Sequence, residues 1–372
     1  MVDTVKLILD KGMFVILDRS RFERKTMNSA RGVYTMVLNP SKADQLKGLY
    51  NPRLTLTHRF NSFGRPEETL AIEFSAPKLL YSNNFNEVSD VDFHKIIGIL
   101  KTKLKIMSVL VMEKDLIKAP VSSIHYSKNF PLTDGSIPYT YLNEISKVNM
   151  TKRYDLDQTS FRNEGHSVKY HTNSFEIAFY DKMKDMEQAK KSEKRAIEKY
   201  NILQLELFEE LKTRKPFEVI RMEVRLNMRQ KIRKIMSMLG FEIEPTFDAL
   251  FKREIAQKIL LHYINEIERG YPIMLHYQRK NSEEFISSFL VHNPKTTIDK
   301  AIKALGLKSL IDEVGLRELR EILKKYSNHS WYRLYKEIKS INLPQSFSCF
   351  SILKSQLEKF ELLTVASYQI TR

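Results

Sequence analysis

The sequence predicts an α+β protein, in which an antiparallel sheet with connecting helices is followed by a helical C-terminal part. Two patterns along the chain predict it. Up to about Leu239, short segments alternate apolar and polar residues with the period of two that is typical of half-buried strands. After Leu239 these segments fade, and apolar residues recur with helical spacing. Since 372 residues are enough for about two domains, we expect a sheet-and-helix domain over 1–239 and a helical domain over 240–372.

The strands expected in the first domain all show this alternation. They lie at residues 4–9, 13–17, 33–38, 54–60, 69–75, 121–128, 175–180 and 218–226. Helices are expected over residues 90–111 and 183–212, and no Gly or Pro interrupts the second of these. Its charged residues are typical of a solvated helix face around an apolar stripe.

The helices expected in the second domain are short. They cover residues 246–269, 283–291, 297–304, 309–314, 316–326 and 331–341. Thr297 can cap the start of one of them, and Gly306 and Gly315 separate the pieces that follow. Such an arrangement can include a helix-turn-helix, but it is common in any α-helical domain. Whether this domain binds DNA or another protein therefore stays open.

The net charge of the chain indicates the kind of partner that it binds. Lys and Arg number 61 against 45 Asp and Glu, which gives a net charge of +16. A folded chain of this charge favours polyanions, nucleic acid before anionic membranes. Cys349 is the only cysteine, which excludes an internal disulfide and a cysteine-based zinc site and suits a reducing cytoplasm. No apolar run of about 18 residues occurs, so no membrane segment is expected.

Four polar residues fall on the polar faces of separate expected strands. Counting with period two places the apolar residues of each strand on one face and Glu73, His125, Tyr180 or Glu223 on the other. If these strands share one sheet with helices on its apolar side, all four side chains can line one surface. Polar residues on the solvent face of an antiparallel sheet are expected in any case, so the set is more informative than any single member.

These residue types together suit phosphodiester chemistry. Glu and His supply the oxygen and nitrogen ligands that suit Mg²⁺ or Mn²⁺, so Glu73, His125 and Glu223 are the candidate metal ligands. Tyr180 ends its strand where the chain turns helical and is the candidate nucleophile. Lys182, two residues on, could hold the phosphate or assist the phenol. The competing interpretation of Tyr180 is an ordinary interfacial tyrosine.

Further charged residues are candidates for contacts with nucleic acid. Arg221 and Arg225 share the polar face of one strand and could contact a phosphate backbone. Arg153 and Lys184 are further candidates for DNA contacts, and Asp155 is a reserve metal ligand. The sequence has no P-loop, dinucleotide-binding glycine motif, nucleophile elbow or His-Glu-x-x-His helix, so the common ATPase, dehydrogenase, hydrolase and zincin functions have no support.

Short motifs, taken in order, resemble those of phage and plasmid rolling-circle replication initiators, the group that includes the gene II protein of filamentous phages. The motifs are AIEFSAPKLLYSNNF (71–85), VSSIHYSK (121–128), AFYDKMKDMEQAK (178–190) and RMEVRLNMR (221–229), with a weaker NHSWYRLYKEIKSINLPQS (328–346). Each motif is unspecific alone, and the ordered set, which spans most of the chain, carries the resemblance.

The resemblance implies an antiparallel-sheet endonuclease related to the His-hydrophobe-His nickases. Such an enzyme nicks one strand of a double-stranded origin through a tyrosine, here Tyr180, with Lys182 as its neighbour. It forms a 5′-phosphotyrosyl link, frees a 3′-OH for synthesis and later rejoins the displaced strand. Glu73, His125 and Glu223 would hold the Mg²⁺ or Mn²⁺. The expected partners are double- and single-stranded origin DNA, with a host helicase and polymerase as further candidates, in the cytoplasm of a bacterial host.

The chain departs from the wider pattern in two places. A single histidine, His125, stands where many nickases have a His-x-His pair, and Tyr-x-Lys replaces Tyr-x-x-Lys, so Lys184 could share the role of Lys182. Two alternatives stay open. A conjugative relaxase or transposase would use the same chemistry, although no helicase motif is present. A non-catalytic DNA-binding regulator would use the basic surface and the helical domain alone.

Overall fold

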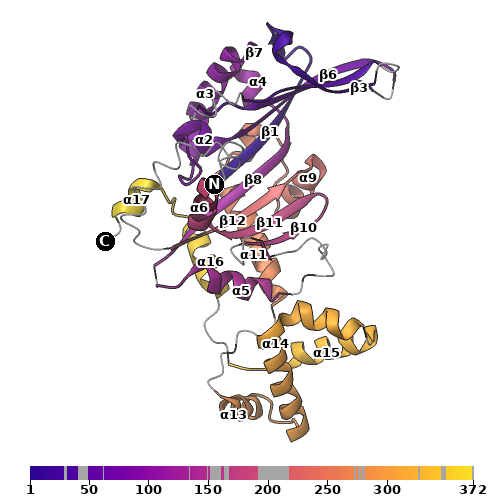
Figure 1. Ribbon diagram of the computed structural model, residues 1–372, viewed down its shortest axis with the longest axis vertical. Coiled ribbons are helices and arrows are strands. Elements are labelled where there is room, and N and C mark those ends of the chain that lie inside the picture. The colour runs from indigo at the N-terminus through magenta and orange to yellow at the C-terminus, as the bar shows by residue number, and fades with distance from the viewer. Residues whose placement is uncertain are drawn as a thin grey trace. The chain divides into compact units, whose positions relative to one another are not determined.

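The computed structural model describes residues 1–28, 32–40, 49–61, 63–133, 135–148, 150, 161–162, 167–191, 218–271, 274, 277, 281–325, 327–344 and 349–370. Over these residues the protein is α+β with a large antiparallel sheet, which confirms the predicted class (Figure 1). No helix in these ranges is both long enough and apolar enough to span a bilayer.

The chain forms two compact units that do not follow the single boundary expected after residue 239. The first unit comprises residues 1–138, 171–260 and 360–372, and the second comprises 139–170 and 261–359. Each unit is thus assembled from separate stretches of the chain. The reason in the first unit is that its sheet needs cover on its apolar face, and helices from beyond residue 239 supply part of it.

The strands of the first unit include every strand expected from the sequence. They are β1 (Val2–Asp10), β2 (Phe14–Ile16), β3 (Glu23–Asn28), β4 (Val33–Leu38), β5 (Arg53–Phe60), β6 (Pro66–Ser75), β7 (Val109–Val111), β8 (Val121–Leu132), β11 (Phe175–Asp181) and β12 (Glu218–Leu226). Those in the large sheet follow the order β3-β4-β5-β6-β1-β8-β12-β11. β2 and β7 pair separately. The N-terminal strand β1 therefore lies in the middle of the sheet, between β6 and β8.

Helices pack on both faces of this sheet, and α10 (Phe247–Leu250) lies on the apolar face. The unit contains α2 (Ala76–Tyr81), α3 (Phe93–Ile106), α4 (Glu113–Ile117), α6 (Lys182–Lys191), α9 (Arg229–Met238), α10, the first part of α11 (Arg253–Arg269) and α17 (Val365–Ile370). Phe247 of α10 packs edge-on against Phe74 of β6, with ring centres 5.8 Å apart, and also meets Phe93 of α3 at 5.0 Å. This aromatic contact joins helices from both halves of the chain to one core.

The second unit contains α5 (Pro138–Ser146), β9 (Phe161–Arg162), β10 (Ser167–His171), α13 (Ser282–His292), α14 (Ile298–Lys324), α15 (Asn328–Ser340) and α16 (Cys349–Lys359). Three short helices expected from the sequence form the single element α14. Gly315 interrupts it as expected, with φ 77° and ψ 162°, a conformation that glycine adopts without strain. Gly306 does not interrupt it, because a glycine weakens a helix without having to end it.

Candidate metal and tyrosine site

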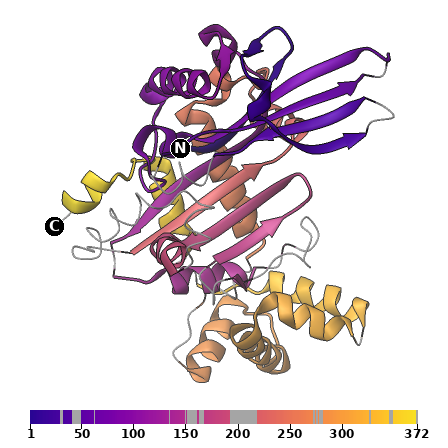
Figure 2. The same cartoon turned by 45° about the horizontal axis from the view of Figure 1, so that its top comes forward.

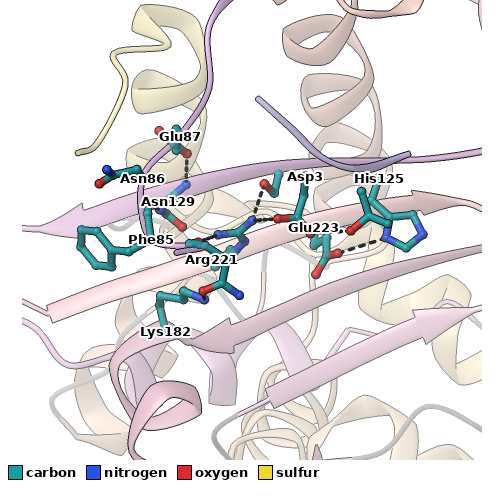
Figure 3. Close-up of polar contacts among 12 residues, drawn as sticks. Asp3, Phe85, Asn86, Glu87, His125, Asn129, Lys182, Arg221 and Glu223 are labelled. Atoms are coloured by element: carbon teal, nitrogen blue, oxygen red, sulfur yellow. Dashed lines mark hydrogen bonds and ion pairs between the residues drawn. The ribbon is translucent and has the colours of Figure 1, made fainter. Parts of the chain in front are cut away.

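Three possible metal ligands meet on the polar face of the sheet. Asp3, His125 and Glu223 each offer one ligand atom, and these atoms all lie within 4.8 Å of one another. They come from β1, β8 and β12, which are consecutive in the sheet. Figure 3 shows the three side chains gathered at one place on the sheet. The group therefore combines two carboxylates and one imidazole.

The register of two strands explains His125 and Glu223. His125 of β8 lies opposite Arg225 of β12, and Glu223 lies opposite Ser127, so all of these side chains leave the same face. The two candidate ligands are diagonal neighbours, and His125 Nδ1 lies 3.4 Å from Glu223 Oε1. The shared face predicted for His125 and Glu223 is confirmed.

A β-bulge in β1 places Asp3 beside His125 and Glu223. Val2 and Val5 lie three residues apart on β1, but their partners on β8 lie only two residues apart, so β1 carries one extra residue. Asp3 and Thr4 consequently stand next to each other on the less buried side of the strand. The bulge turns the Asp3 carboxylate toward the polar face, beside β8 and β12.

Glu223 is charged at neutral pH. Burial would raise the pKa of its carboxyl, since the side chain is only 4% exposed. The Arg225 guanidinium at 2.9 Å, together with His125, outweighs burial and holds the pKa of Glu223 well below its usual range. A carboxylate of this kind is a weak proton acceptor. It is better suited to hold a cation than to act as a general base.

Tyr180 lies beside this group. It pairs with Arg221 across β11 and β12, on the face predicted for it, and its hydroxyl lies 3.5 Å from Glu223 Oε2. Burial raises the pKa of Tyr180 well above its ordinary value, Arg221 opposes this rise and Glu223 adds to it. The phenol therefore keeps its proton at neutral pH unless a cation bound nearby stabilises the phenolate.

Arg221 does not face solvent, so the expected contact with a DNA backbone is not met. Its side chain is 2% exposed. The guanidinium donates to Asp3 Oδ1 at 2.7 Å, to the Ser127 hydroxyl at 2.8 Å and to the Asn84 carbonyl at 2.6 Å. Arg221 thus orients Asp3 from inside the protein. Arg225 is 29% exposed, and its guanidinium is shared between Glu223 and a second carboxylate on β11.

Lys182 is buried too, which changes its expected role. Its side chain is 0% exposed, and Nζ donates to Asn84 Oδ1 at 2.8 Å. Nζ also lies 5.9 Å from the centre of the Tyr180 ring. Lys182 therefore supports the tyrosine instead of offering its charge at the surface. Lys184 is exposed at the start of α6, where its backbone N–H donates to Asp181 Oδ1, and it remains a candidate for DNA contacts.

The loop that carries Asn84 is anchored to the sheet by a buried ion pair. Glu87 accepts a hydrogen bond from Lys128 Nζ at 2.7 Å. A second comes from the Asn129 backbone N–H at 2.6 Å (Figure 3). Glu87 also accepts from the backbone N–H of Leu363 at 2.8 Å. The side chains of Lys128 and Glu87 are 2% and 1% exposed. This anchoring fixes Asn84, whose side-chain oxygen accepts from Lys182 and whose carbonyl accepts from Arg221.

Glu73 does not join the metal-ligand group. β1 separates β6 from β8, and Glu73 lies opposite Lys6 on β1 and Arg53 on β5. Two strand spacings, roughly 9.5 Å, lie between the strands of Glu73 and His125. Asp3, from the intervening strand, stands where Glu73 was expected. Arg153 and Asp155 lie outside the residues that the structure describes.

Sequence reasoning missed Asp3 and Asn84. The signal for Asp3 is present: in VDTVKLIL two polar residues in succession break an otherwise regular alternation, which indicates a bulge. Asn84 has no such signal, because its role depends on a loop that folds back onto the sheet.

The chain matches no protein-family model, and no curated protein or solved structure is significantly similar to it. The chemistry of the site therefore follows from its own residues. Arg221 contacts Oδ1 of Asp3, whose Oδ2 accepts from the Thr4 hydroxyl at 3.1 Å. Arg225 contacts Oε2 of Glu223, whose Oε1 lies 3.4 Å from Nδ1 of His125. Oxygen and imidazole donors of this kind suit Mn²⁺ or Mg²⁺.

Proposed function

We propose that the protein cuts one strand of DNA by metal-dependent transesterification, with Tyr180 as the nucleophile. The 3.5 Å approach of the Tyr180 hydroxyl to Glu223, within the group that also contains Asp3 and His125, carries this proposal. A divalent cation held by the group would polarise a phosphate oxygen beside the phenol. The net charge of +16 favours a polyanionic substrate.

In this reaction the Tyr180 oxygen attacks phosphorus and the phenol loses its proton. The bond from phosphorus to the 3′ oxygen breaks, and that oxygen takes up a proton to become a free 3′-OH. The 5′ end stays joined to Tyr180 as a phosphodiester, so a 3′-OH can reverse the step without ATP. Arg221 would hold Asp3, and Lys182 would hold the tyrosine ring, as positioning residues.

This chemistry and the ordered sequence motifs support a role as a rolling-circle replication initiator. The free 3′-OH would prime synthesis, and the phosphotyrosyl link would preserve the energy needed to rejoin the displaced strand. A relaxase or transposase would use the same step. One observation favours a non-catalytic DNA-binding protein instead: Arg221 and Arg225 already neutralise the two carboxylates without a metal.

Incubation with supercoiled origin plasmids from phages and rolling-circle plasmids separates these functions. With Mg²⁺ or Mn²⁺, the protein should give nicked circles with protein attached to the 5′ end. Tyr180→Phe removes one oxygen and should abolish nicking and attachment while plasmid binding stays within about twofold. Tyr139→Phe, at a 50% exposed tyrosine of α5 that is not among the site residues, is the matched control. Nicking by Tyr180→Phe would rule out Tyr180 as the nucleophile. Plasmid binding by the unaltered protein without any nicking would favour the non-catalytic DNA-binding regulator.

A further inference from the structure

A pocket of about 520 Å³ lies among α13, α14 and α15 in the second unit. Both views of the chain show α14 next to α13 and α15 (Figures 1 and 2). The walls come from the end of α13, the start of α14, the loop between them and the end of α15. Pockets that bind small molecules measure about 300–1,000 Å³. The volume of this pocket therefore suits a small-molecule ligand.

Hydrogen bonds through Asn293 hold the walls of the pocket together. Its side-chain amide donates to the Phe289 carbonyl on α13 and to the Asn342 carbonyl beyond α15, both at 2.8 Å. Its side-chain oxygen accepts from the Asn342 backbone N–H at 3.3 Å. One side chain thus joins two walls that lie 49 residues apart in the sequence. Because these bonds fix the walls without a ligand, binding costs little ordering of the protein.

Part of the pocket wall is apolar and belongs to the core of the three helices. The apolar lining residues are Phe289, Ala304, Leu307 and Ile341, and all four are buried. Apolar side chains of this kind favour contact with an apolar part of a ligand, since that contact removes apolar surface from water. We expect a ring or another apolar group of the ligand to lie against this apolar wall.

Positive charge exceeds negative charge among the lining residues. The charged ones are Lys295, Lys300, Lys303 and Glu337. Lys303 is ion-paired with Glu337, so these two charges compensate each other. Within the described part of the chain, Lys295 and Lys300 form no ion pair, and both are exposed. Asp299, in the first turn of α14, is exposed and does not line the pocket. Two uncompensated cations therefore remain at the pocket.

We propose that this pocket binds a phosphate monoester of nucleotide size, with its phosphate on Lys295 and Lys300 and its ring on the apolar wall. A phosphate monoester carries a charge of about −1.5 to −2 at pH 7, which matches two uncompensated cations. A single carboxylate would leave one of them uncompensated. Lysine binds phosphate as a point charge, whereas bidentate recognition of a carboxylate favours arginine. No arginine is among the described residues that line the pocket.

Isothermal titration calorimetry of the full chain in EDTA tests both halves of the pocket with three probes. The probes are deoxyadenosine 5′-monophosphate, deoxyadenosine and inorganic phosphate. The monophosphate should bind more tightly than the other two, because it alone contacts both the lysines and the apolar wall. Deoxyadenosine or inorganic phosphate binding as tightly as the monophosphate would overturn the proposal. EDTA removes divalent cations, so the probes cannot bind through a metal at the Tyr180 site, and the result does not depend on the proposed function.

Lys300→Gln tests the phosphate contact, and Lys325→Gln is its matched control. Lys325 is exposed too, but it lies at the opposite end of α14 and does not line the pocket. Lys300→Gln should weaken binding of the monophosphate about fivefold, the upper range for an exposed ion pair, and leave binding of deoxyadenosine unchanged. Lys325→Gln should change neither. Thermal unfolding of both variants should match that of the unaltered protein, because both lysines are exposed.

Glu337→Gln should have the opposite effect. It releases Lys303 from its ion pair and adds a third cation to the pocket, so the monophosphate should bind about twofold to fivefold more tightly. A glutamate that only supports the fold would instead weaken binding when it is replaced. Weaker binding by Glu337→Gln, or equal effects of Lys300→Gln and Lys325→Gln, would overturn the proposal.

Two short single strands, one with a 5′-phosphate and one without it, identify the source of the ligand by competition with the monophosphate. Competition by the phosphorylated strand alone supports the pocket as a site for the end of a DNA strand. If neither strand competes, the pocket takes a free nucleotide or a similar small phosphate. Equal competition by both strands would show binding of the strand backbone and would overturn the assignment to a phosphate monoester.

Discussion

Asp3 and Arg221 form an ion pair of 2.7 Å although 218 residues separate them in the sequence. Their strands β1 and β12 are not neighbours, because β8 lies between them. Arg221 reaches across β8, where the Ser127 hydroxyl accepts a second hydrogen bond from it at 2.8 Å. The ion pair connects β1, at the start of the chain, to β12, which pairs with the strand of Tyr180. It also sets the Asp3 carboxylate beside His125 and Glu223.

Asp3→Asn should weaken binding of Mn²⁺ at least about tenfold, because it keeps the shape of the side chain and removes a ligand charge. Isothermal titration calorimetry at pH 7 measures the affinity. Glu73→Gln is the control: it removes one carboxylate from the same face but from a strand outside the group, and the affinity should not change. A larger loss for Glu73→Gln than for Asp3→Asn would reverse the ligand assignment.

Arg221→Met should lower the free energy of unfolding by about 3–5 kcal/mol, since it leaves partly buried Asp3 without its cation. Urea denaturation measures the change. Arg233→Met removes an ion pair with Glu244 in which both side chains are more than half exposed, and it should cost less than about 1 kcal/mol. In a double-mutant cycle with Asp3→Asn, the two losses should be less than additive. Full additivity would show that the pair contributes nothing to stability.

The buried pair of Glu87 and Lys128 should make stability depend on pH. Burial would raise the pKa of Glu87, but the Lys128 charge and hydrogen bonds outweigh it, and the pKa lies below its usual value. The ionised form therefore stabilises the fold above the unfolded pKa of about 4.3, and this contribution is lost as pH falls through the folded pKa. Glu87→Gln should cost about 3–5 kcal/mol at pH 7.

Urea denaturation at several pH values tests this prediction. The difference between the unaltered protein and Glu87→Gln should be constant at neutral pH and shrink below about pH 4. Glu113→Gln, in an ion pair whose two side chains are 51% exposed, should change the free energy of unfolding by less than about 1 kcal/mol at every pH. A Glu87→Gln difference that grows in acid would contradict the depressed pKa.

Leu363→Ala should destabilise the packing between the loop over residues 83–88 and the start of α6, next to Tyr180. Leu363 packs in a buried cluster with Phe85, Met183 and Met186, and its backbone N–H donates to Glu87. Removing a buried leucine side chain costs about 2–5 kcal/mol. Hydrogen exchange should also quicken in the loop over residues 83–88 and at the start of α6. Leu310→Ala, at a 46% exposed position of α14, is the control and should alter neither measurement.

The strands were predictable from the sequence because alternation is a local property. The strand expected at 218–226 agrees with β12 at both ends, and the expected strand at 33–38 agrees with β4. Helix ends were less predictable. Gly315 breaks α14, where its φ is positive, but Gly306 stays helical. Whether a glycine ends a helix depends on the packing around it, which its neighbours in sequence do not reveal.

The sequence by itself determined which side of its strand each candidate residue occupies. His125, Tyr180 and Glu223 share one face because side chains alternate along any strand, whatever its neighbours. Only the tertiary structure decided which strands are adjacent. β1 lies between β6 and β8, so Asp3 joins His125 and Glu223 and Glu73 does not. Strand order depends on long-range pairing and on helices packed against the apolar face, and the local period carries no information about either.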